Sequence, residues 1–259
     1  MIDLQFAREE FRKYLDQYDR NDEKIKLKII HTEGVIDCVR KITSRMDISV
    51  EDKNLAELIA LLHDIGRFEQ IRCFDSFEPG TMDHAAYGVG LLFGPQNMIR
   101  QFVRDTQWDP IIKTAIAKHS DFQLEDITDE QTLFHAKMIR DADKLDNCRV
   151  KLEESVEVLV GTTAQNAGTY EISDKVWEAC LHNCSVRSAD RITPMDYWVS
   201  YLAYFFDVNF SETFQIIEEE NYVERIIQQI PYSNPDTQKK MDVLCGRIQT
   251  FISFRASCN

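Results

Sequence analysis

The sequence predicts an all-α protein, with a helical bundle core followed by a C-terminal helical extension. Apolar residues recur at spacings of three and four along most of the chain, which is the period of an amphipathic helix. Glycine and proline are few, nine and six in 259 residues, whereas strand-and-turn proteins need many of both. Hydrophobic residues make up 44% of the chain, so it can bury a sizeable core.

Two helices are expected in the first quarter of the chain, and each carries a histidine near its apolar face. The first covers residues 24–46 and has His31 at the edge of its apolar arc. The second covers residues 51–65 and has His63 at its end, where Gly66 is a typical helix stop. We therefore expect His63 to face the interior at a helix end.

Two more histidines follow on predicted helices. His84 lies at the start of a helix that Thr81 or Asp83 can cap. The Asp-Pro pair at 109–110 is a helix-start signal, and His119 continues the apolar stripe of the helix that follows. Both histidines are expected to point inward.

A carboxylate occupies an apolar position in the next predicted helix. Between residues 130 and 147, Ala136, Ile139 and Asp143 recur at spacings of three and four. A buried carboxylate without a partner is costly, so Asp143 requires a compensating charge.

The chain beyond residue 150 keeps the helical pattern without a comparable cluster of polar residues. Helices are expected over 171–182, 194–208, 211–229 and 234–254, and a loop is expected over 161–168. We place a boundary near residue 155. Residues 1–155, including an N-terminal helix, form the expected metal-binding core, and residues 156–259 form a helical extension that packs on or caps it.

Composition excludes several classes of partner. Lys and Arg total 30 against 44 Asp and Glu, a net charge of −14 that disfavours duplex nucleic acid and anionic membranes. No stretch reaches the roughly 18 apolar residues of a membrane span. The seven cysteines have no regular spacing and the first ten residues lack an apolar signal core, so we expect a cytoplasmic protein with reduced thiols.

Six of the polar residues on these helices are good ligands for divalent metals: His31, His63, Asp64, His84, His119 and Asp143. Neutral imidazole suits Mn, Fe, Co, Ni and Zn, and Mg becomes a candidate where carboxylates dominate. Buried polar groups need partners, and a shared metal ion would provide one for each of these inward-facing side chains. The adjacent pair His63-Asp64 can organise two ions, because the histidine can bind one while the carboxylate reaches toward a second.

This ordered series resembles the HD-domain superfamily of metal-dependent phosphohydrolases over about residues 20–150. The residues that carry the resemblance are His31, His63-Asp64-Ile65-Gly66, His84, His119, and Asp143 within the stretch 140–146. The resemblance implies an HD-domain helical bundle in which His31, His63, Asp64 and Asp143 hold a first metal. It further implies that His84 and His119 hold a second metal, with Asp64 bridging the two.

One departure separates the chain from the cyclic-di-nucleotide phosphodiesterases of that superfamily. Those enzymes usually have a second histidine after the position of His119 and a downstream Gly-Tyr-Pro motif. This chain has Ser120 and Asp121 instead, and it lacks Gly-Tyr-Pro.

The site chemistry predicted from these residues is hydrolysis by a metal-activated water. Two divalent ions outweigh two aspartates, so the site stays positive inside an acidic protein and can hold a phosphate. Asp64 and Arg67 are the catalytic candidates, and Arg67, Lys118 and Lys144 are possible substrate contacts. Asp141 and Asp146 are candidates for orienting a histidine ligand.

The leading hypothesis is a phosphohydrolase that cleaves a phosphoester or phosphoanhydride bond of a small substrate, with a nucleotide as the favoured class. Two alternatives stay open: a di-iron oxygenase with the same fold and ligands, and a noncatalytic protein that binds metal or nucleotide for regulation. The sequence leaves open the exact substrate, the metal, and the oligomeric state.

Overall fold

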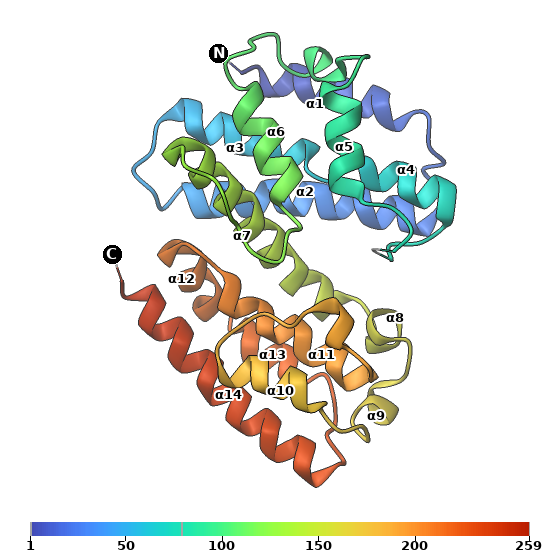
Figure 1. Ribbon diagram of the computed structural model, residues 1–259, viewed down its shortest axis with the longest axis vertical. Helices are drawn as coiled ribbons and strands as arrows, with labels where there is room; N and C mark the ends of the chain where they lie inside the picture. The colour runs from blue at the N-terminus through green and yellow to red at the C-terminus, as the bar shows by residue number, and fades with distance from the viewer. Residues whose placement is uncertain (1, 79, 259) are drawn as a thin grey trace. The chain divides into compact units, whose positions relative to one another are not determined.

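A computed structural model describes residues 2–78 and 80–258 (Figure 1). All regular elements among these residues are helices, which confirms the predicted all-α class. The chain divides into two compact units, Met1–Asp143 and Lys144–Asn259. No helix among the described residues is long and apolar enough to span a bilayer.

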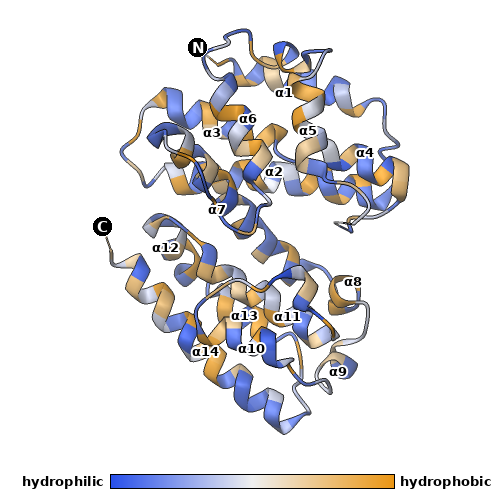
Figure 2. Ribbon diagram, viewed as in Figure 1, coloured by the Kyte–Doolittle hydropathy of each residue, from blue (hydrophilic) through white to orange (hydrophobic). Residues whose placement is uncertain are grey.

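The first unit holds most of the helices that carry the candidate ligands. Its elements are α1 (Leu4–Leu15), α2 (Glu23–Thr43), α3 (Val50–Leu62), α4 (Ile65–Phe74), α5 (His84–Phe93), the 3-10 helix η1 (Met98–Gln101), α6 (Asp109–Lys118), and the first part of α7 (Glu130–Glu153). Figure 2 shows hydrophobic and hydrophilic residues alternating along these helices, as amphipathic helices require.

Local sequence determines where these helices begin. The Asp22 carboxylate accepts hydrogen bonds from two backbone N–H groups of the first turn of α2. Asp83 caps α5, so of the two candidates for this cap, Thr81 and Asp83, the structure selects the aspartate. Pro110 lies in the first turn of α6, as the Asp-Pro pair predicts.

The core of the first unit is built on α3, which packs against α2. Leu55, Leu58, Ile59 and Leu62 are fully buried along it. Burying a side chain of this size contributes about 1.5–3 kcal/mol. The apolar stripe of α3 therefore anchors the helix end at which His63 lies.

Gly66 does not end a helix, and this corrects a sequence-based expectation. It lies in the first turn of α4, and two residues separate the end of α3 from the start of α4. A Cβ atom on Gly66 would lie 2.2 Å from the carbonyl oxygen of His84 and 2.9 Å from the backbone nitrogen of Gly88. The glycine therefore lets the first turns of α4 and α5 touch, which brings Asp64 close to His84.

The second unit contains the rest of α7 and a set of shorter helices around Trp198, which is fully buried. Its other elements are α8 (Val156–Val160), α9 (Ala164–Ala167), α10 (Asp174–Leu181), η2 (Ser188–Asp190), α11 (Pro194–Ala203), η3 (Tyr204–Asp207), α12 (Ser211–Glu219), α13 (Tyr222–Ile227) and α14 (Pro235–Ala256).

Two details of the second unit differ from expectation. The helix predicted over 211–229 is broken into α12 and α13 at Asn221, whose φ of 49° is left-handed and ends helical continuation. The loop predicted over 161–168 contains the single-turn helix α9, which the Thr163 hydroxyl caps.

The division between the units falls inside the long helix α7, between Asp143 and Lys144. The boundary predicted near residue 155 lies just after the end of the same helix. That this boundary separates a metal-binding core from a helical extension stays a prediction.

Candidate metal centre

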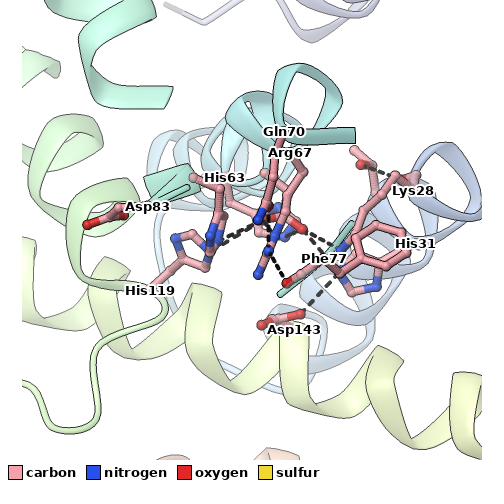
Figure 3. Close-up of polar contacts among 12 residues, drawn as sticks. Lys28, His31, His63, Arg67, Gln70, Phe77, Asp83, His119 and Asp143 are labelled. Atoms are coloured by element: carbon pink, nitrogen blue, oxygen red, sulfur yellow. Dashed lines mark hydrogen bonds and ion pairs between the residues drawn. The ribbon is translucent and has the colours of Figure 1, made fainter. Parts of the chain in front are cut away.

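The six predicted ligands come from six different helices or helix ends. Figure 3 labels four of them: His31, His63, His119 and Asp143. His31 lies within α2 and Asp143 within α7, whereas the other four lie at helix ends: His63 after α3, Asp64 before α4, His84 at the start of α5 and His119 after α6. The four histidines and Asp64 are buried, and the side chain of Asp143 is 25% exposed. Packing of these helices therefore assembles the cluster.

Asp64 lies between two histidine pairs. Its Oδ2 atom is 3.8 Å from Nε2 of His31 and 3.6 Å from Nε2 of His63, which form the first pair. Its Oδ1 atom is 3.3 Å from Nε2 of His84 and 3.4 Å from Nε2 of His119, which form the second pair. The two carboxylate oxygens thus face two different sets of nitrogen atoms.

The distances within each set suit a shared ion. Ligands bound to one divalent ion at about 2.1 Å lie about 3.0–4.2 Å from one another. The Nε2 atoms of the second pair are 3.0 Å apart, and Oδ1 of Asp143 is 3.1 Å from Nε2 of His31. Asp64 therefore completes a candidate site with each pair, and Asp143 lies beside His31 of the first pair.

His63 provides an independent test of this interpretation. Its Nδ1 lies 2.7 Å from the carbonyl oxygen of Ala60, which can only accept, so Nδ1 carries the proton. Its Nε2 atom therefore has a free lone pair, which is buried and makes no hydrogen bond. Burial lowers the pKa of His63 to about 4, so the ring is neutral at pH 7. A metal ion would satisfy this lone pair, so the residues fit the group that the sequence implies.

His119 is held in the same way, with Nδ1 2.7 Å from the carbonyl oxygen of Ile116. Backbone carbonyls, not Asp141 or Asp146, therefore orient His63 and His119. Asp146 instead accepts a hydrogen bond of 2.7 Å from Nε of Arg149.

The protonation states at the centre are those that metal binding requires. Burial alone would raise the pKa of Asp64, but the charge of Lys28 beside it, with smaller contributions from the surrounding histidines, holds it well below its usual value. Burial opposes ionisation of Asp143 too, and the hydrogen bond from His31 reverses that effect and lowers its pKa. Burial also lowers the pKa of His84. Ionised carboxylates and neutral imidazoles are the ligand forms that bind metal.

Asp64 also lacks the hydrogen bonds that are common at its position in the chain, the N-cap of a helix. Aspartate at a helix N-cap commonly accepts hydrogen bonds from the first-turn N–H groups. Asp64 occupies the N-cap of α4 but makes no such bond. Its carboxylate is directed to the histidines and to Lys28 instead.

Lys28 belongs to the site and is not among the residues predicted from the sequence. Its Nζ atom lies 2.6 Å from Oδ2 of Asp64, and its side chain is 15% exposed. The available signal was its position three residues before His31, which places both on one face of α2 (Figure 3).

Arg67 lies beside the centre, with Nε 3.7 Å from Oδ1 of Asp64. Its Nη1 atom donates to Oε1 of Gln70 at 2.7 Å and to the carbonyl oxygen of Phe77 at 3.0 Å. The guanidinium is thereby fixed next to the bridging carboxylate. Its catalytic role stays a prediction.

The other two predicted substrate contacts each pair with a carboxylate. Nζ of Lys118 is 3.7 Å from Oδ2 of Asp121, and Nζ of Lys144 is 2.9 Å from Oδ2 of Asp207 in the second unit. Their role as substrate contacts stays a prediction.

Arg140 supports the helix end that carries His119, although it is not among the site residues predicted from the sequence. It is buried, and Nη1 donates to the carbonyl oxygens of Lys118, His119 and Asp121 at 3.2, 3.1 and 2.5 Å. A guanidinium that binds the last carbonyls of a helix stabilises its end. Arg140 therefore fixes the end of α6, where His119 lies.

Comparison with known proteins agrees with this geometry. The model of the HD domain family matches residues 29–148, a range that contains all six candidate ligands. No curated protein and no solved structure matches the chain. The family match and the two groups of ligands around Asp64 lead to one conclusion: residues 29–148 are similar to the HD domain family and carry a cluster of histidines and aspartate that is consistent with its metal site.

Proposed function

We propose that this protein is a metal-dependent phosphohydrolase that cleaves a P–O bond of a small phosphorylated compound, with nucleotides as the favoured substrate class. The match of residues 29–148 to the HD domain family supports hydrolysis of this kind. The observation that carries the proposal is the position of Asp64, whose two oxygens face two separate histidine pairs. This is the arrangement that a two-metal hydrolytic centre needs.

The chain contains a ligand set for each of two ions. His31, His63 and Asp143 would hold the first ion and His84 and His119 the second, with Asp64 shared. Divalent ions held in this way supply a water of lowered pKa and stabilise charge on phosphate oxygens.

The protein side chains contribute positioning and charge. Lys28 and Arg67 balance the negative charges of Asp64 and Asp143, so bound ions give the centre a net positive charge. Burial lowers the pKa of His63 and of His84, which favours the neutral imidazoles that can bind metal. A compact anion is therefore favoured at the centre although the whole chain is acidic.

The test is activity on a broad panel of phosphate compounds with Mn, Fe, Co, Ni, Mg or Zn supplied. The panel contains an aryl phosphate, an aryl diester, and nucleoside mono-, di- and triphosphates, with phosphate release and nucleotide products measured. Asp64→Ala should lower kcat on the order of a thousandfold or more, since it removes the ligand shared by both sites. Asp47→Ala, at an exposed residue between α2 and α3, is the control and should match the wild type.

Equal activity of the Asp64→Ala variant and the wild type would contradict the proposal. Oxygen uptake that depends on iron and on an added substrate, without phosphate release, would instead favour the oxygenase alternative.

A further inference from the structure

The ammonium group of Lys28 lies at the oxygen of Asp64 that faces the first histidine pair. The distance from Nζ to Oδ2 is 2.6 Å, shorter than the distances from that oxygen to His31 and His63. With 5% and 15% of their side chains exposed, Asp64 and Lys28 form a largely buried ion pair. Leaving either charge of such a pair without its partner is costly, and a cation bound to the same oxygen is repelled by the ammonium.

This position is unfavourable for a residue whose only task is to support metal binding. Residues that strengthen a metal site usually accept hydrogen bonds from its ligands or add negative charge. A lysine at the ligand atom does the opposite, because its charge has the same sign as that of the ion. Its presence is explained if the centre must also bind an anion.

Lys28 and Arg67 flank the same carboxylate from opposite oxygens, and both contact Phe77. The Lys28 ammonium lies 5.6 Å from the centre of the Phe77 ring, and Arg67 donates to the Phe77 carbonyl. The segment around Phe77 is itself fixed, because Nε2 of Gln70 donates to the carbonyl of Glu78 at 3.0 Å and to Oγ1 of Thr81 at 2.8 Å. Two cations are thus held beside the candidate metal centre, next to the segment that follows α4 (Figure 3).

We propose that Lys28 is a substrate-binding residue that contacts a non-bridging oxygen of the phosphoryl group, and that the site prefers a terminal phosphoryl group to an internal diester. A terminal group has three non-bridging oxygens and two negative charges, whereas a diester has two such oxygens and one charge. Two ions and a lysine can bind all three oxygens of a terminal group. This inference rests on the proposed function and specifies its substrate class.

The test compares Lys28→Met, which keeps the length of the side chain and removes the charge, with Lys28→Arg, which keeps the charge. Lys26→Met is the matched control, since Lys26 lies on the same helix and pairs only with the exposed Glu23 among the contacts described. Lys28→Gln is a second neutral variant, used if Lys28→Met does not fold.

Two binding measurements separate substrate binding from support of the metal site. Titration of metal-free protein with Mn²⁺ should show equal or several-fold tighter binding by Lys28→Met, because the competing ammonium is absent. Titration of the Mn²⁺-loaded protein with inorganic phosphate should show binding about tenfold weaker, since a charge-assisted hydrogen bond is lost. Lys28→Arg should stay within about threefold of the wild type for phosphate, and Lys26→Met should be unchanged in both titrations.

Turnover provides the specificity measurement. The ratio of kcat/KM for an aryl monophosphate to that for an aryl phosphodiester should fall about tenfold in Lys28→Met. A purely structural role would lower both values together and leave the ratio unchanged.

Three results would overturn the inference: weaker Mn²⁺ binding by Lys28→Met in parallel with weaker phosphate binding, unchanged phosphate binding, or an unchanged specificity ratio. The proposed function is judged separately. A wild type that hydrolyses no phosphate compound defeats the proposed function, whereas phosphate binding to the Mn²⁺-loaded protein is still measured without turnover. Hydrolysis with unchanged phosphate binding in Lys28→Met defeats only the inference about Lys28.

Discussion

Asp64 follows His63 directly, and a break between two helices lets both side chains face the same interior. Consecutive residues on one continuous helix point about 100° apart. Here α3 ends at Leu62 and α4 begins at Ile65, so the pair lies at the junction and its side chains are free of that constraint. The bridging position of Asp64 thus depends on this junction.

The individual ligands could be predicted from sequence, whereas their partners could not. Histidines and a carboxylate on apolar faces are visible as a pattern because a helix has a fixed period. Lys28 and Arg140 look like ordinary basic residues in sequence, since nothing local indicates that one meets Asp64 and the other the end of α6. Those contacts depend on how helices pack, which the period of a single helix does not specify.

A histidine outside the centre gives a pH dependence that can be tested. His135 is buried, with Nε2 3.2 Å from Oδ1 of Asp52. Burial lowers its pKa, and the hydrogen bond and charge of Asp52 only partly oppose this. In the unfolded chain the pKa is about 6.5, so below that pH the unfolded state takes up a proton that the folded state does not. The free energy of unfolding should therefore fall as the pH drops below about 6.5, by up to about 1.4 kcal/mol per pH unit from this residue.

Urea unfolding of the metal-free protein at pH 7.0 and pH 5.5 measures this effect. His135→Asn should show a smaller loss of stability between the two pH values than the wild type. His182→Asn, at an exposed histidine, should show the same loss as the wild type. An unchanged pH dependence in His135→Asn would refute the assignment.

At the scale of elements, the contact between α4 and α5 is the part of the architecture that the sequence conceals. Gly66 after a His-Asp pair is an acceptable helix stop by composition, and the structure uses it for close packing instead. The same limit applies at Asn221, where no Gly or Pro interrupts the apolar period although the backbone turns left-handed. Long helices with strong periods were predicted well, but breaks made by single residues need tertiary contacts to be recognised.

The packing role of Gly66 can be tested by comparing Gly66→Ala with Gly90→Ala. In Gly66→Ala the new Cβ would meet the His84 carbonyl at 2.2 Å, so the first turns of α4 and α5 must separate. We expect a loss of about 1–3 kcal/mol in the free energy of unfolding and weaker Mn²⁺ binding at the His84 and His119 site. Gly90→Ala, also in α5, meets nothing within 4 Å and should be neutral or up to about 1 kcal/mol more stable. Thermal unfolding and Mn²⁺ titration measure both effects, and equal behaviour of the two variants would contradict the packing role.

At the scale of the whole molecule, net charge and local charge have opposite consequences. The chain carries −14, yet the side chains at the centre are balanced and divalent ions would make it positive. Recognition of an anion is therefore local. All seven cysteines are free in the structure, and the reduced compartment stays a prediction.

The fold class and the six candidate ligands could be predicted because both follow from periodicity and residue type. The substrate could not, because it depends on residues such as Lys28, Arg67 and Phe77, which meet only in the folded chain. The contribution of residues 144–259 to the function stays a prediction, since the candidate ligands all lie before residue 144.

The central claim is that Asp64 joins two ion sites, and the number of ions bound per chain tests it most directly. Metal-free protein is titrated with Mn²⁺, and bound metal is measured by elemental analysis, with folding checked by circular dichroism. We expect two ions per chain for the wild type, one for His84→Ala, and loss of tight binding at both sites in Asp64→Ala. A wild type that binds no ion or only one, or an Asp64→Ala variant that still binds two, would contradict the claim.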